Sequence, residues 1–180
     1  MEVYDTSRKQ KALTILRRIP LFAGLDDKEF DHIYSICNIK AVDTDEFLFE
    51  EGSASRHLYV LINGKVEIAT KKNGVIYVVK PGEVFGEIGM ISQRNRTASA
   101  VARDKAVVIE IKREDFNLLL GKHPRVTAVL LKNITISLSD HIIRMNNRES
   151  LDYIHTRRRP AQRRSLFHRF TPEAILEEDD

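Results

Sequence analysis

Residues 82–101 read GEVFGEIGMISQRNRTASAV, and they interrupt a series of short strand patterns with glycines, a carboxylate after Phe85 and two arginines. A simple pair of strands would not need these residues. A glycine such as Gly86 lets the backbone approach a ligand closely, and a short helix that starts there presents the free N–H groups of Glu87 and Ile88 to an anion. The segment therefore predicts a phosphate-binding turn.

Two charged side chains extend this prediction from a phosphate to a nucleotide. Arg96 follows Glu87 by nine positions, so it can return from the far side of the loop and offer two phosphate oxygens a planar guanidinium. A carboxylate such as Glu87 suits this place if it accepts a hydrogen bond from a ligand hydroxyl, and a ribose 2′-OH is one. The alternative is an exposed ion pair between the two side chains beside a turn.

Short apolar strands separated by turns surround this segment between Asn38 and Lys112. Because a type I′ turn needs positive φ at both central residues, Asn63-Gly64 predicts a hairpin between HLYVLI and KVEIAT. Many short strands at this spacing favour a compact antiparallel barrel or jelly roll. The fold class that we expect is mainly β with flanking helices.

Helical patterns precede the strands. Residues 7–19 predict a short amphipathic helix that ends before Pro20. Asp26, with Glu29 three positions later, is typical of a capping box that starts a second helix. Cys37, the single cysteine, falls in the apolar pattern of that second helix, so we expect a buried structural thiol.

Helical patterns return after the strands. One helix begins at Arg113 and stops at Gly121, and a longer one runs from near Pro124 to about Asn147. The apolar face of the longer helix needs a partner to cover it. We expect this helix to rest partly against the mouth of the barrel or against a second subunit.

A chain of 180 residues is long enough for one well-buried core and too short for two ordinary domains. Beyond Glu149, six arginines between Arg157 and Arg169 precede an acidic end. The expected organisation has three parts: an N-terminal helical segment (1–36), a barrel with C-terminal helices (37–147) and a charged flexible tail (148–180). The arginine-rich tail is open to three interpretations, which are a solvated segment, a polyanion contact and a docking site for an acidic partner.

Composition narrows the function classes. The start of the chain lacks the apolar core of a signal sequence, and no apolar run approaches the ~18 residues of a membrane span, so we expect a cytoplasmic protein without a membrane span. The six histidines form no HExxH motif or Cys/His cluster, so no metal and no cofactor are predicted. No nucleophilic serine motif or Walker-type GK[ST] segment is present, so we expect no enzyme activity.

The segment FGEIGMISQRNRTASAV resembles the phosphate-binding cassette of cyclic-nucleotide-binding domains, F-G-E-[LI]-[AG]-L-x₅-R-[AT]-A, and IPLFAGLDDKEF before it fits the same family. The resemblance covers about residues 15–145. It implies an eight-stranded antiparallel jelly roll with short N-terminal helices and a long C-terminal lid helix, as in kinase regulatory subunits, cyclic-nucleotide-gated channels and the bacterial catabolite activator. Glu87 would hold the ribose 2′-OH, and Arg96 would pair with the cyclic phosphate. The remaining phosphate contacts would come from Gly86, Ile88, Thr97 and Ala98.

The resemblance also places residues around the base of the nucleotide. Strands aligned with the family put Ile68, Tyr77 and Val79 there, although ordinary core positions are the alternative for all three. The long helix would close over the base. Alignment from Pro124 places four residues near the lid position: Ser137, Asp140, His141 and Arg144.

The choice of base stays open at Thr97, because cGMP-binding relatives and some cAMP-preferring channels both carry threonine there. Our expectation is cAMP rather than cGMP. The leading hypothesis is a regulatory sensor that couples ligand binding to a downstream protein that the sequence does not identify, or to a second copy in a homodimer. The alternatives are a ligand-free jelly-roll scaffold and a nucleic-acid-binding regulator that uses the basic tail. Specific DNA binding is not expected, because about thirty residues with few apolar side chains follow the long helix.

Overall fold

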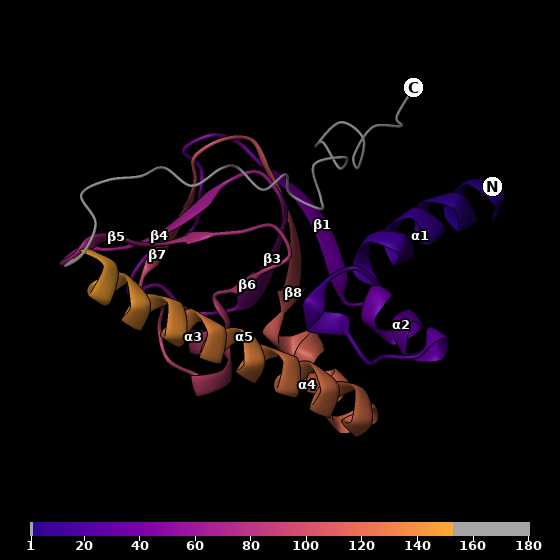
Figure 1. Ribbon diagram of the computed structural model, residues 1–180. Coiled ribbons are helices and arrows are strands. Elements are labelled where there is room, and N and C mark those ends of the chain that lie inside the picture. The colour runs from indigo at the N-terminus through magenta and orange to yellow at the C-terminus, as the bar shows by residue number, and fades with distance from the viewer. Residues whose placement is uncertain (1, 153–180) are drawn as a thin grey trace.

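The computed structural model describes residues 2–152, and the expected tail lies outside them from residue 153 onward. Figure 1 shows the strands as a central body, with α1 and α2 grouped at one side and α5 running along it. The helices are α1 (Glu2–Leu16), the 3-10 turn η1 (Pro20–Phe22), α2 (Asp27–Tyr34), α3 (Glu87–Ser92), α4 (Arg113–Lys122) and α5 (Pro124–Asp152). The strands are β1 (Cys37–Val42), β2 (Phe47–Phe49), β3 (His57–Asn63), β4 (Val66–Thr70), β5 (Gly74–Val79), β6 (Val84–Phe85), β7 (Ser99–Ala102) and β8 (Ala106–Lys112).

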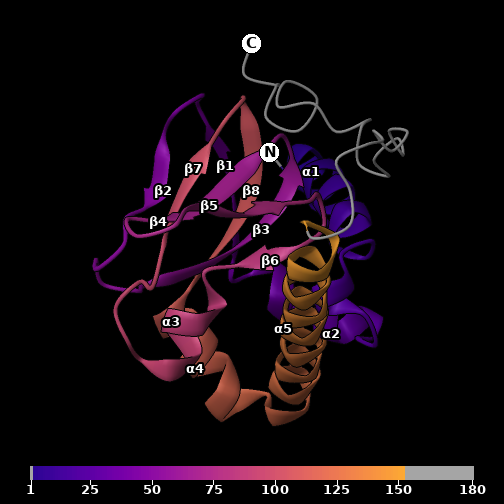
Figure 2. The same ribbon diagram turned by 60° about the vertical axis from the view of Figure 1, so that its left-hand side comes forward.

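Within the described residues, eight strands form two four-stranded sheets. The strand order is β1-β8-β3-β6 in one sheet and β2-β7-β4-β5 in the other, and neighbouring strands are antiparallel. The sheets remain separate and do not close into a continuous barrel. Figure 2 shows both sheets, with α3 at one end and α5 beside β6. The architecture confirms the predicted fold class, a mainly β jelly roll with flanking helices.

The central strands β3 and β8 of the first sheet are buried on both faces. Because successive side chains of a strand point to opposite faces, Tyr59 and Leu61 of β3 lie in the core between the two sheets. The residues that alternate with them lie in a second core, which the helices cover: Leu58, Val60 and Ile62. Residues of β8 are divided between the two cores in the same way. This double burial makes the β3–β8 pair a rigid support for the segments attached to it.

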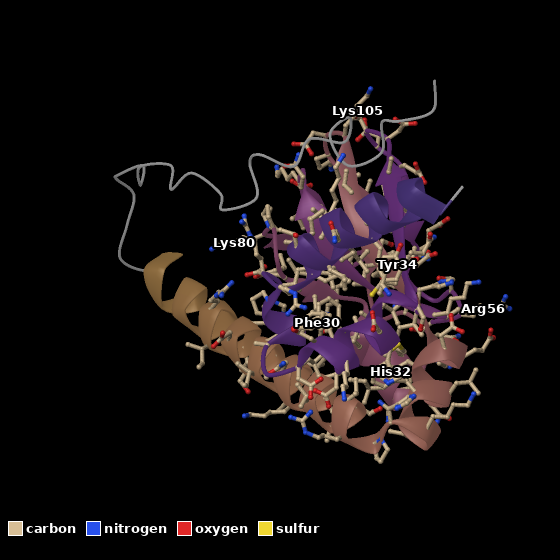
Figure 3. The ribbon with its side chains drawn as sticks, turned by 90° about the vertical axis from the view of Figure 1, so that its right-hand side faces the viewer. Phe30, His32, Tyr34, Arg56, Lys80 and Lys105 are labelled. Atoms are coloured by element: carbon tan, nitrogen blue, oxygen red, sulfur yellow. The ribbon has the colours of Figure 1, made fainter. Side chains whose placement is uncertain are left out.

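The capping box predicted at the start of α2 is confirmed. The Asp26 side chain accepts a hydrogen bond from the Glu29 amide at 3.0 Å, and the Glu29 carboxylate accepts one from the Asp26 amide at 2.9 Å. Phe30 on the same helix is buried in the core that the helices cover. Figure 3 views the molecule from the side of α2, with Phe30 labelled on that helix.

Some element boundaries differ from the expectation. The prediction that Cys37 lies in the second helix was wrong, because α2 ends at Tyr34 and Cys37 starts β1, where it pairs with Ile111 of β8. Cys37 is half-buried and not fully buried as expected, and desolvation raises the pKa of its thiol. The first helix begins at Glu2, and α5 continues to Asp152, beyond the predicted Asn147.

The hairpin predicted at Asn63-Gly64 was also wrong. The flanking strands β3 and β4 belong to different sheets, so the turn is a crossover and not a hairpin. Gly64 has φ of +92°, whereas Asn63 is not among the residues with positive φ. A Cβ added at Gly64 would lie 2.6 Å from the carbonyl oxygen of Lys105 and 2.7 Å from the Cα of Ala106. The glycine is therefore required because backbone crosses backbone at this corner.

The close backbone contact at Gly64 predicts that alanine costs more stability there than at Gly74. Gly64→Ala should lower the free energy of unfolding by about 3 kcal/mol, because it adds a backbone collision to the strain of positive φ. Gly74→Ala carries the strain alone, since φ is +65° and nothing lies within 4 Å of the added Cβ, and should cost about 1 kcal/mol. Urea denaturation of the two variants measures the difference. Equal losses would contradict the crossing.

Candidate functional site

The predicted phosphate turn forms a short helix that follows a glycine in the left-handed conformation. β6 ends at Phe85, Gly86 adopts the left-handed conformation with φ of 76° and ψ of 7°, and α3 begins at Glu87. A Cβ added at Gly86 would lie 2.7 Å from the Nη1 atom of Arg96. Glycine thus permits both the turn and the close approach of the arginine.

Two backbone hydrogen bonds fix the position of Arg96. Its amide donates to the carbonyl of Ser53 at 2.8 Å, and its own carbonyl accepts from the amide of Gly52 at 2.8 Å. The loop after α3 is therefore tied to the connection between β2 and β3. This tie returns Arg96 to the turn from which α3 starts, as the sequence predicts.

The guanidinium of Arg96 is held by main-chain oxygens. Nη1 donates to the carbonyl of Gly86 and Nη2 to the carbonyl of His57, both at 2.6 Å. Within the described residues, its Nε atom is buried and has no hydrogen-bond partner. The side chain is only 5% exposed, and burial lowers its pKa. Among the residues that the structure describes, no carboxylate therefore forms an ion pair with this buried cation.

Glu87 is equally buried, at 5% exposure. Burial raises the pKa of its carboxyl, against opposing effects of its own amide and of the Arg96 charge. Because both residues are almost fully buried, the alternative of an exposed ion pair between them is excluded. Two buried, opposite and separately placed charges are a costly arrangement for a protein to keep without a role.

Both side chains line a cavity of about 230 Å³ at the open end of the strands. Nine of the twelve residues predicted to bind the ligand line it. They are Ile68 and Tyr77 from β4 and β5, Gly86, Glu87 and Ile88 from the turn, Arg96, Thr97 and Ala98 from the loop, and His141 from α5. Segments far apart in the sequence therefore meet at one place.

The other three predicted residues lie elsewhere. Val79 shares a strand face with Tyr77, but it sits opposite Val66 and is buried in the core between the sheets. Ser137 and Asp140 line a neighbouring cavity of about 310 Å³ between η1, the β5–β6 turn and α5. The helical repeat explains the division, because their side of α5 is rotated from the side that faces the first cavity.

The fold and the cavity have counterparts among known proteins. Residues 39–123 match the family model described as the cyclic nucleotide-binding domain. These residues form a cyclic nucleotide-binding domain. The cyclic AMP receptor protein of Thermus thermophilus is 31% identical over 111 residues, which cover 59% of this chain and 51% of that protein. The chain thus spans about half the length of this relative.

Two solved structures share the architecture of this cyclic nucleotide-binding domain. A cyclic nucleotide-binding domain from Methylobacillus flagellatus has a TM-score of 0.71 at 23% identity, covering 83% of this chain and 86% of that one. The regulatory domain of Toxoplasma gondii PKA, solved with cAMP, has a TM-score of 0.55 at 26% identity, covering 62% of this chain and 44% of that one. Domains of this family are regulatory.

A polar cluster joins α5 to the strands beside the cavity of the domain. Tyr77 donates through its hydroxyl to Glu83 at 2.6 Å, and Arg144 donates to both Glu83 and, at 3.0 Å, the Tyr77 oxygen. Burial alone would raise the pKa of Glu83, but hydrogen bonds from Tyr77, the Lys80 amide and Arg144 lower it overall. Arg144, predicted near the lid position, thus anchors the helix and does not line the first cavity.

His141 lies between the anchored end of α5 and the cavity. Its ring packs on Tyr77 with centroids 4.7 Å apart, and it lines both cavities. Burial lowers the pKa of the imidazole, which favours its neutral form. Within the described residues, its buried Nε2 atom has no hydrogen-bond partner. The Glu83 carboxylate lies 3.9 Å from this atom, so the imidazole joins the polar cluster to the wall of the first cavity.

Several lining residues were missed by the sequence reasoning. The six are Phe49, Val84, Phe85, Gly89, Leu138 and Ile142. Phe85 and Gly89 belong to the quoted cassette and could have been included. Leu138 and Ile142 are four positions apart, so they share one face of α5, and this spacing is also available from the sequence. Phe49 reaches the site only through the fold, so no local pattern identifies it.

The part of the chain that the structure describes contains no group of three or more His, Cys, Asp or Glu residues placed to hold a metal ion. The segment Pro124–Arg144 of α5 is long and apolar enough to cross a membrane by length and composition alone. Val126, Leu130 and Ile134 of that segment are buried in the core, although only 22% of its apolar window is buried.

The raised pKa of Glu87 predicts a stability cost at neutral pH. A carboxyl whose pKa is raised on folding stabilises the fold only while it is protonated, and this contribution is lost as the pH rises through the folded-state pKa. Glu87→Gln should therefore raise the melting temperature of the ligand-free protein at pH 7. The gain should shrink as the pH falls through the raised pKa of Glu87 and should be gone below the ordinary value of 4.5.

Glu67 is the matched control, because hydrogen bonds from Lys65 and Arg103 lower the pKa of its carboxyl. Glu67→Gln should lower the melting temperature at pH 7. The loss should fade as the pH falls through the lowered pKa of Glu67. A loss of stability in Glu87→Gln at pH 7 would contradict the burial argument.

Proposed function

We propose that this chain is a non-catalytic cytoplasmic sensor that binds a cyclic mononucleotide, cAMP in preference to cGMP, and transmits binding through α5. The family and the regulatory class of the domain are established above. The ligand, its contacts and the movement are the proposal. It keeps the division into a helical segment (1–36), the ligand domain (37–147) and a tail (148–180).

The observation that carries the proposal is the buried, unneutralised guanidinium of Arg96 beside the buried carboxyl of Glu87. A cyclic phosphate has one negative charge and two free oxygens, which suit the planar donor of Arg96. The amides at the start of α3 and the loop residues Thr97 and Ala98 line the same cavity. Glu87 would then accept a hydrogen bond from the ribose 2′-OH.

The base would lie between the strands and α5. Ile68 and Tyr77 offer one wall, and Leu138, His141 and Ile142 offer the other. His141 brings an imidazole to this wall, and its Nε2 atom has no hydrogen-bond partner among the described residues, although the Glu83 carboxylate lies 3.9 Å away. The preference for cAMP rests on this largely apolar wall, which is better suited to adenine than to the more polar guanine.

The lid proposal follows from how α5 is attached. Val126, Leu130 and Ile134 secure its first part in the core, whereas its later part is held mainly by the Arg144–Glu83 contact. A ligand that touches His141 would add to that second attachment. Since a ligand shifts an equilibrium only by its different affinity for the two states, contacts with α5 are what would link binding to a downstream protein.

Removing the arginine tests the phosphate assignment. Arg96→Ala should weaken cAMP binding by ~1.5–3 kcal/mol, which is roughly tenfold to a hundredfold in Kd. Arg96→Lys should restore only part of the affinity, because an ammonium group lacks the planar fork. Equilibrium dialysis with labelled cAMP and cGMP measures both variants.

Arg94 is the matched control, since it lies two residues away in the same loop and is exposed. Arg94→Ala should bind cAMP as the wild type does. A folded Arg96→Ala protein with unchanged affinity would remove the phosphate assignment. Equal losses in the two variants would indicate a general charge effect instead of a site.

The lid proposal predicts a separate effect of Arg144. Arg144→Ala removes the contacts of α5 with Glu83 and Tyr77, so hydrogen exchange at residues 138–144 should accelerate in the ligand-free protein. The affinity for cAMP should fall about threefold to tenfold, because part of the binding energy must now order the helix.

Ile143→Ala is the control, because that neighbouring side chain is 56% exposed. It should leave both the exchange rates and the affinity unchanged. If saturating cAMP does not slow exchange at residues 138–144 of the wild-type protein, α5 is not the lid. The signal would then leave through another element.

A further inference from the structure

Three aromatic rings from three strands pack together beneath Arg96. Phe49 of β2 lies 5.9 Å from Tyr59 of β3 and 6.3 Å from Phe85 of β6, measured between ring centroids. Tyr59 and Phe85 are 5.4 Å apart and nearly parallel. We refer to Phe49, Tyr59 and Phe85 as the aromatic shelf.

The guanidinium of Arg96 rests on this shelf. Its Cζ atom lies 3.9 Å from the centroid of the Phe49 ring and 5.9 Å from that of Tyr59. A cation within about 6 Å of a ring centroid is attracted by the negative face of the ring, and the attraction is larger when water is excluded. Phe49 is therefore the closest aromatic contact of a buried charge.

The other contacts of Arg96 do not replace this one. The carbonyls of Gly86 and His57 bond to the edge of the guanidinium and restrict it within its own plane. They leave the group free to tilt about the line that joins them. A ring stacked on the face opposes this tilt, because the guanidinium would lose contact with the ring as it turned.

We propose that Phe49 is a positioning residue for the ligand phosphate, acting by holding the plane of the Arg96 guanidinium. This inference rests on the proposed function, in which Arg96 meets the phosphate. The role depends on the flat shape of the guanidinium, so it applies to arginine and not to a lysine at the same position. It also requires an aromatic ring at Phe49 and not merely an apolar side chain.

Substitutions of Phe49 distinguish the effect of its aromatic ring from the effect of its size. Phe49→Leu should weaken cAMP binding about fivefold to tenfold, whereas Phe49→Tyr, which keeps the ring face, should bind within twofold of the wild type. Phe49→Met is the second apolar variant if the leucine protein does not fold, since its flexible side chain fills irregular space. Thermal unfolding checks that each variant is folded.

Phe47 is the matched control on the same strand. Its side chain is 55% exposed and it does not line the cavity. Phe47→Leu should leave the affinity for cAMP unchanged. A loss equal to that of Phe49→Leu would show that β2 as a whole is disturbed and would overturn the assignment.

A double-mutant cycle with Arg96 distinguishes positioning from direct contact, because Phe49 also lines the cavity. In an Arg96→Lys background, Phe49→Leu should cost less than twofold, since no planar group remains to be held. The same fivefold to tenfold loss in both backgrounds would overturn the positioning role and assign Phe49 to direct ligand contact.

The outcomes for the wild-type protein separate this inference from the proposed function. If the wild type binds neither cAMP nor cGMP, the proposed function fails and the positioning role fails with it. If the wild type binds cAMP and Phe49→Leu binds it equally well, only the positioning role is overturned.

Discussion

The arrangement of the site depends on one constraint, which is that the guanidinium of Arg96 is buried and pairs with no carboxylate in the part of the chain that the structure describes. Removing a charge from water costs several kcal/mol unless the protein compensates it. Here the compensation comes from two main-chain carbonyls and an aromatic face. These contacts require a glycine at position 86 and fixed strands beneath the arginine. The turn, the loop and the aromatic shelf therefore act together to stabilise the buried guanidinium.

The jelly roll supplies the rigidity that is needed to hold Arg96 in place. β3 carries His57, whose carbonyl bonds to Arg96, and Tyr59, which belongs to the shelf, and its central residues are buried on both faces. The opposite wall of the cavity is attached differently, because the later part of α5 depends on contacts of Arg144 and His141 with Glu83 and Tyr77. The cavity thus has a rigid wall where the phosphate would bind and a less firmly attached wall where the base would bind. This arrangement suits a domain in which ligand binding changes the position of α5.

Local patterns predicted much of this structure because local rules determine those parts. The capping box at Asp26, the start of α5 at Pro124 and the turn at Gly86 each depend on neighbouring residues. The predicted hairpin at Asn63-Gly64 failed because the need for glycine there arises from a distant segment, at Lys105. Phe49 was missed for the same reason, since its contact with Arg96 joins residues 47 positions apart. Ser137 and Asp140 line the neighbouring cavity instead of the predicted one. The rotation of α5 about its axis decides this, and packing against the rest of the fold sets that rotation.

The central claim is that the buried Arg96 site recognises the phosphate of a cyclic nucleotide. Calorimetric titration of the chain with cAMP, cGMP and 5′-AMP tests this claim most directly, because the third ligand has the same base and sugar but an open, more highly charged phosphate. We predict saturable one-site binding of the cyclic nucleotides, with 5′-AMP at least tenfold weaker than cAMP. Absence of saturable binding of either cyclic nucleotide to the folded protein, or equal affinity for cAMP and 5′-AMP, would contradict the account.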